Sequence, residues 1–135
     1  MKLKPVLTAE DVTRALDASR AEAQRNGWSV TIAVVDDGGH LLALQRLDGA
    51  SPLTAELAAA KARTSALGRR ESKRYEDIVN EGRPAFLSAP LTGMLEGAVP
   101  IIADGQVVGA VGVSGVKSEQ DVQVARAGVE AALAG

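Results

Sequence analysis

The sequence predicts one α+β domain built around an antiparallel sheet. Apolar, β-branched stretches occur in two pairs, and a short turn rich in aspartate and glycine joins each pair. Strands connected so closely run antiparallel, because a parallel connection needs a dozen or more residues. Amphipathic helical patterns occupy most of the remaining chain, as in layered domains. The length of 135 residues suits one domain, and we assign residues 1–135 to it.

The chain begins with a helix and a hairpin. Thr8 has the features of a helix N-cap followed by acidic residues, and Gly27 supplies the left-handed residue that ends a helix. Residues 29–35 are rich in β-branched side chains and residues 41–47 are mostly apolar, which predicts two strands. The turn between them contains two glycines, which adopt positive φ without steric cost.

Two helices are expected next. Pro52 suits the first helical position, and the helix that it starts should run to about Leu67. This helix is rich in alanine, which favours close packing on a sheet or on another copy of the chain. A shorter helix is expected at residues 72–80, before an apolar loop at residues 85–96 with an optional short strand near Phe86.

A second hairpin and a last helix complete the predicted order. Asp104 and Gly105 form a two-residue turn between strands at residues 99–103 and 106–113, and Ser118 opens the final helix. The order is helix, strand, strand, helix, helix, optional strand, strand, strand, helix. We expect the helices to pack on one face of the sheet, which leaves the other face for self-association to bury.

Composition argues against several functional classes. The net charge is −2 and the chain has one residue each of Trp, Tyr and Phe, so it lacks the clustered basic and stacking side chains that bind nucleic acid. No apolar run is long enough to span a membrane, and the first residues lack the pattern of a signal peptide. The absence of cysteine fits a cytoplasmic location and excludes disulfides and cysteine–histidine zinc sites.

The single histidine, His40, must supply any chemistry that needs an imidazole. Asp36 and Asp37 precede it closely enough to hydrogen-bond one ring nitrogen, which would leave the other free as a base or a metal ligand. A histidine beside a turn is also commonly an ordinary surface residue, and aspartate before glycine is a common turn former. The residues alone leave both interpretations open.

Three stretches of the chain carry a family resemblance. They are residues 34–50 (VVDDGGHLLALQRLDGA), 59–64 (AAKART) and 104–128 (DGQVVGAVGVSGVKSEQDVQVARAG). Together they resemble the GlcG/HbpS-like haem-binding family, which is similar to the C-terminal domain of PduO-type cobalamin adenosyltransferases. The resemblance implies a profilin-like domain that assembles into dimers or larger homo-oligomers and, in some members, binds haem. Members also accompany the catabolism of glycolate and other small organic acids.

The resemblance also implies a ligand site. His40 is the candidate axial ligand of haem iron, and four further residues belong to the ligand region: Met94, Leu95, Gly97 and Ser114. The leading hypothesis is a homo-oligomeric protein that binds haem or another small ligand. The alternative is an enzyme that performs lyase-type or isomerase-type acid–base chemistry on a small molecule, with His40 oriented by Asp37 in the same pocket. A third hypothesis is a structural or regulatory oligomer in which His40 only holds the turn.

Overall fold

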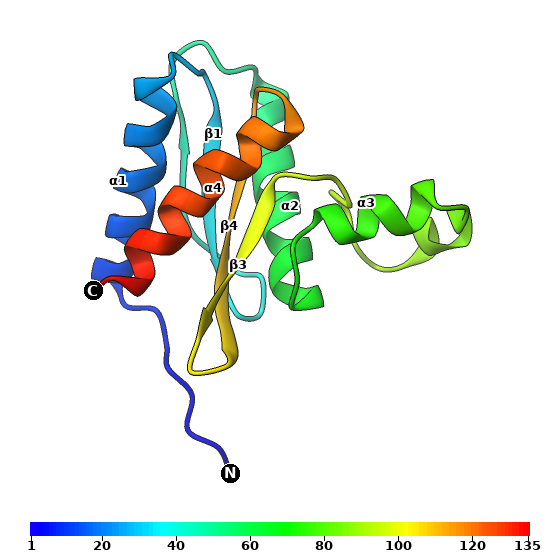
Figure 1. Ribbon diagram of the computed structural model, residues 1–135, viewed down its shortest axis with the longest axis horizontal. Coiled ribbons are helices and arrows are strands. Elements are labelled where there is room, and N and C mark those ends of the chain that lie inside the picture. The colour runs from blue at the N-terminus through cyan, green and yellow to red at the C-terminus, as the bar shows by residue number, and fades with distance from the viewer.

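A four-stranded antiparallel sheet with the strand order β2-β1-β4-β3 forms the middle layer of the computed structural model, which describes residues 1–135 (Figure 1). The elements in chain order are α1 (Ala9–Arg25), β1 (Thr31–Asp36), β2 (Leu41–Arg46), α2 (Pro52–Gly68), α3 (Lys73–Asn80), the 3₁₀ helix η1 (Pro84–Ser88), β3 (Ala98–Ala103), β4 (Gln106–Ser114) and α4 (Ser118–Leu133). The predicted α+β class and the predicted order of the four helices and four strands are confirmed. None of the helices is both long and apolar enough to cross a membrane.

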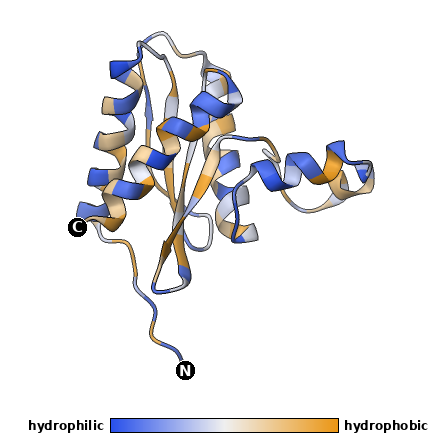
Figure 2. Cartoon of the chain, in the orientation of Figure 1, coloured by the Kyte–Doolittle hydropathy of each residue, from blue (hydrophilic) through white to orange (hydrophobic).

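α1 and α4 lie side by side on one face of the sheet (Figure 1). Successive side chains of a strand point to opposite faces, so Ile32 and Val34 of β1 both point toward these helices, with which they share a hydrophobic core. The two helices come close together at Gly128, where a Cβ atom would lie 2.3 Å from Ser19 Oγ. Figure 2 shows hydrophobic residues concentrated on the strands beneath the helices.

α2 covers the opposite face. Ala33 and Val35 of β1 pack there against three alanines of α2, which are Ala58, Ala62 and Ala66. The contact is close, because a Cβ atom at Gly112 would lie 2.4 Å from the carbonyl oxygen of Ala58. The prediction that helices cover only one face is therefore wrong. β1 is buried at each position from Thr31 to Val35, which is the pattern of a strand covered on both sides.

The segment that contains α3 and η1 projects from the body as an arm, residues 73–88 (Figure 1). The rings of Tyr75 and Phe86 stack there with their centroids 5.5 Å apart, so two of the three aromatic residues lie in the arm and not beneath the helices. The optional strand near Phe86 is wrong, because this residue belongs to η1. Pro84 at the start of η1 has no N–H for a strand ladder but suits the first position of a helix.

Candidate functional site

The structure places the predicted site residues at two opposite ends of the sheet. His40 follows the end at which Asp36 of β1 pairs with Gly109 of β4. Ser114 lies at the other end, where it pairs with Thr31. A strand rises about 3.3 Å per residue, so these two ends of β1 lie about 16 Å apart. We call them the His40 end and the Ser114 end, and a single chain does not bring them together.

At the His40 end, the imidazole lies in open solvent with 82% of its side chain exposed. Its Nδ1 lies 3.2 Å from Asp36 Oδ1, and no group of the chain binds Nε2. The same carboxylate oxygen accepts hydrogen bonds from the backbone N–H groups of Gly38 and His40, each at 2.9 Å. Desolvation acts to raise the pKa of Asp36, but these hydrogen bonds and the nearby imidazole outweigh it and lower the pKa. Asp36 therefore shapes the turn and orients the ring.

Asp37 does not contact the imidazole. Its carboxylate accepts a hydrogen bond from Lys4 Nζ at 2.7 Å, which lowers the pKa of Asp37. The expectation that Asp37 orients His40 is corrected, since Asp36 occupies that position. The physical reason is the turn itself: an aspartate at the start of a turn accepts hydrogen bonds from backbone N–H groups a few residues later. The side chain of Asp36 is thereby held close to the residue that follows the turn.

The other predicted residues gather at the Ser114 end. Met94, Leu95 and Gly97 belong to the loop that leads into β3, and Ser114 ends β4. The carbonyl oxygen of Gly97 accepts a hydrogen bond from Val113 N at 2.9 Å, so the loop lies directly on the end of β4. Met94 and Ser114 are buried, whereas Leu95 is exposed.

A buried ion pair lies beneath this loop. Lys61 of α2 and Asp121 of α4 have side chains only 6% and 4% exposed, with Nζ 3.3 Å from Oδ2. Lys61 Nζ also donates to the carbonyl oxygen of Val113 at 3.1 Å, and Asp121 Oδ1 accepts from the N–H of Val116 at 3.2 Å. Burial raises the pKa of Asp121, and the ammonium of Lys61 opposes this in part. Glycine is required above the pair, because a Cβ atom at Gly97 would lie 2.6 Å from the carbonyl oxygen of Val113 and 2.8 Å from Lys61 Nζ.

Lys61 and Asp121 were not among the predicted site residues. Lysine is rarely fully buried, so a lysine in an alanine-rich helix is ordinarily taken as solvated. A signal was present, because Lys61 follows Ala58 by three residues and residues at this spacing share a helix face. The pair joins α2, β4 and α4 and is closed to solvent. It can stabilise the Ser114 end, but it offers no open coordination site.

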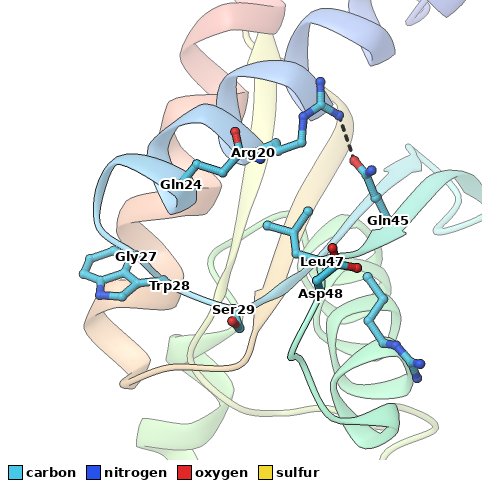
Figure 3. A pocket seen from close by; sticks show the side chains of 9 residues that line it. Arg20, Gln24, Gly27, Trp28, Ser29, Gln45, Leu47 and Asp48 are labelled. Carbon is cyan, nitrogen blue, oxygen red and sulfur yellow. Dashed lines mark hydrogen bonds between the residues drawn. The ribbon is translucent and has the colours of Figure 1, made fainter.

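A polar cleft of about 450 Å³ lies between the C-terminal half of α1 and the end of β2 (Figure 3). Its lining residues are Arg20, Gln24, Gly27, Trp28, Ser29, Gln45, Arg46, Leu47 and Asp48. Arg20 Nη1 donates to Gln45 Oε1 across the cleft at 2.7 Å. None of the predicted site residues lines this cleft, and its polar wall does not suit an apolar macrocycle. Nowhere in the structure do three His, Asp or Glu side chains come together to hold a metal ion.

Comparisons with known proteins give the family. A family model described as "Haem degrading protein HbpS-like" matches residues 7–130. The chain belongs to this family. Among the relatives of this HbpS-like chain, Protein GlcG of Escherichia coli (strain K12) is 56% identical over 114 residues, which cover 84% of this chain and 85% of that protein.

Two solved structures share the fold of this HbpS-like chain. The crystal structure of HbpS has a TM-score of 0.87 and 34% sequence identity, and the match covers 96% of this chain and 92% of that one. The crystal structure of the PduOC:heme complex has a TM-score of 0.84 and 25% identity, and the match covers 94% and 95% of the two chains. The HbpS-like domain is therefore related in both sequence and fold to a domain crystallised with heme.

Proposed function

We propose that this protein binds haem as a homo-oligomer, with His40 as an axial ligand of the iron. The observation that carries the proposal is the imidazole itself, which is held at Nδ1 by Asp36 and leaves Nε2 open to solvent. Ligating histidines usually bond a carboxylate or carbonyl through their second nitrogen, as this one does. Membership of the HbpS-like family and the likeness to the PduOC:heme complex support haem as the group bound.

The surface beside His40 suits part of a haem. Leu41 and Leu67 are exposed near the turn and offer apolar contact to a macrocycle. Arg63 also borders the turn, because a Cβ atom at Gly39 would lie 2.8 Å from its Cγ. Its guanidinium is available to a propionate, since arginine binds carboxylates well. One chain thus provides an axial ligand, one apolar wall and a cation.

A second copy of the chain would supply the opposite wall. Ligand sites bury most of their ligand between apolar walls, and a ring as exposed as His40 has no such enclosure within one chain. The loop that carries Met94, Leu95 and Gly97 lies at the far end of the sheet, as does Ser114. We therefore place these four residues on a neighbouring copy, where Leu95 is the exposed member that reaches the ligand.

Titration of haemin into the purified protein tests this proposal. We expect a saturable shift of the Soret band at one equivalent per chain. His40→Ala should abolish or change the ligation spectrum, because the chain has no other imidazole. Asp48→Ala is the matched control, since Asp48 is also an exposed residue after a strand but lies at the opposite end of β2. An unchanged Soret spectrum in His40→Ala would exclude His40 as the ligand.

The contact between His40 and Asp36 also supports a second function. An imidazole oriented by a carboxylate can act as a general acid or base on a small organic acid, which is the alternative that the sequence suggested with Asp37 in the orienting position. A panel of small acids tested by thermal unfolding would reveal such a substrate class. A ligand at about 100 times its Kd adds about 2.7 kcal/mol of stability. His40→Ala should remove both this stabilisation and any turnover.

A further inference from the structure

We propose that β2 is the strand through which two copies of this chain pair, antiparallel and about a twofold axis near Ala43. β2 forms one edge of the sheet. An edge strand leaves a row of backbone N–H and C=O groups without partners, and these groups can pair with another strand. The inference rests on the homo-oligomer of the proposed function and does not depend on haem.

The side chains of β2 support pairing. Leu41, Leu42 and Leu44 are 54%, 44% and 37% exposed, so this edge strand carries three exposed large apolar side chains, although its register with β1 shifts between Leu41 and Ala43. Edge strands that remain free in solution commonly carry charged residues or proline. Within β2 the only charged residue is Arg46, at the end of the strand. The apolar surface of β2 is therefore typical of a strand that another surface covers.

The opposite edge, β3, is covered where the strand begins. Ala98 donates its N–H to Ser72 Oγ at 3.0 Å and accepts a hydrogen bond from Ser72 N at 3.2 Å, so the segment before the arm already occupies the outer edge there. Pro100 has no N–H to offer. β2 has no such contact along its outer edge, which favours β2 over β3 as the strand that pairs with another copy.

The charges at the two ends of β2 select the direction of pairing. Arg46 takes part in none of the ion pairs within the chain. The other end of β2 follows the turn that contains Asp36 and Asp37. Antiparallel pairing places Arg46 of each copy near Asp36 of the other, twice per dimer, whereas Asp37 of the same turn is already paired with Lys4. Parallel pairing would bring the two Arg46 side chains together, and like charges repel.

The occupant that fits this edge is thus a second copy of the same chain. A twofold axis repeats each contact, so one apolar strand with Arg46 at one end and Asp36 near the other complements itself. The arrangement also brings Arg46 of the second copy near His40, where its guanidinium is available to a carboxylate of a ligand.

Single cysteines test the interface directly, because the chain has none of its own. Leu42→Cys, Ala43→Cys and Leu44→Cys place a thiol at or next to the proposed axis. A residue at the axis faces its own copy, within the Cα separation of about 4.4–6.8 Å that a disulfide allows. We expect at least one of the three to form a covalent dimer under mild oxidation. Ile102→Cys is the matched control, since Ile102 is 48% exposed on the β3 edge, and it should remain uncrosslinked.

The mass of the unmodified protein in solution, measured by light scattering, distinguishes failure of the proposed homo-oligomer from failure of the β2 interface alone. A monomer would overturn both the proposed homo-oligomer and the β2 interface. An oligomer whose β2 cysteines do not crosslink, or whose Ile102→Cys variant crosslinks equally well, would overturn only the interface. Crosslinking of β2 cysteines to a different protein alone would also overturn it. Arg46→Glu should raise the dimer dissociation constant about tenfold or more, because it places a carboxylate near Asp36 of the other copy.

Discussion

The two ends of the sheet hold their titratable side chains in opposite ways. At the His40 end, an imidazole and Asp36 meet in open solvent, whereas at the Ser114 end Lys61 and Asp121 meet with side chains 6% and 4% exposed. Water screens an exposed pair, which adds little to stability and remains available to a ligand. A buried pair loses its hydration, so removal of one partner leaves an uncompensated charge. The difference makes the exposed end the one suited to the proposed ligand recognition and the buried end the one suited to stability.

The largest expected effect comes from breaking the buried pair. Lys61→Met leaves the carboxylate of Asp121 buried without its cation, which should lower the free energy of unfolding by about 3–5 kcal/mol. Urea denaturation of the variant and the parent measures this loss. The double variant Lys61→Met with Asp121→Asn should recover most of it, because the amide oxygen can still accept from Val116 N without a charge. A single variant as stable as the parent would show that the pair is dispensable.

A methyl group added above the pair should lower the free energy of unfolding by less than Lys61→Met does. Gly97→Ala forces a Cβ atom to 2.6 Å from the carbonyl oxygen of Val113 at a φ of +145°, so we expect a loss of about 2–3 kcal/mol. Gly82→Ala is the matched control, because Gly82 also has positive φ but no atom within 4 Å of the added Cβ. The difference between the two variants in chemical denaturation isolates the contact from the backbone strain. Equal losses would mean that the loop moves freely off β4.

Substitutions at the His40 end should change the free energy of unfolding only slightly. Asp36→Ala removes the acceptor of two backbone N–H groups, which should cost about 1 kcal/mol. His40→Ala should change the free energy of unfolding by less than about 0.5 kcal/mol, because its ring is exposed. If His40→Ala destabilised the protein as much as Lys61→Met does, the proposed difference between the two ends of the sheet would be wrong.

The smallest expected effect is on the pH dependence of the free energy of unfolding, to which Asp36 and Asp121 should contribute with opposite signs. The pKa of Asp36 is lowered on folding, so its contribution to stability is present above the ordinary value of 3.8 and is lost as the pH falls through the folded value. The pKa of Asp121 is raised, so the folded state takes up this proton first and acidification in that window favours folding. Unfolding free energies measured from about pH 7 to pH 3 should therefore fall less in Asp36→Asn, and more in Asp121→Asn, than in the parent. Parallel curves for all three proteins would contradict this.

Local chemistry made most of the elements predictable. Thr8 forms the expected N-cap, and its capping box with Asp11 is present in the structure. Asp104 and Gly105 form the expected hairpin turn, with φ values of +51° and +72°. Each of these features depends on residues within four positions of one another, and a single sequence displays such spacings directly.

The candidate site was predictable only in part. The sequence indicated His40 as a candidate and predicted a carboxylate beside it. It did not distinguish Asp36 from Asp37, because the path of the turn decides which of the two side chains reaches the ring. The resemblance grouped Met94, Leu95, Gly97 and Ser114 with His40. The register of β1 with β4 sets them at the other end of the sheet, and pairing between distant strands has no local signature.

The sequence by itself determined the order of helices and strands and left one imidazole available for chemistry, because propensity, capping and turn formation act over a few residues. Only the tertiary structure decided that α2 covers the second face, that Lys61 is buried against Asp121, and that β2 is an edge of the sheet. These outcomes depend on contacts between residues far apart in the chain. Which groups water can reach is a property of the assembled layers and not of any single segment.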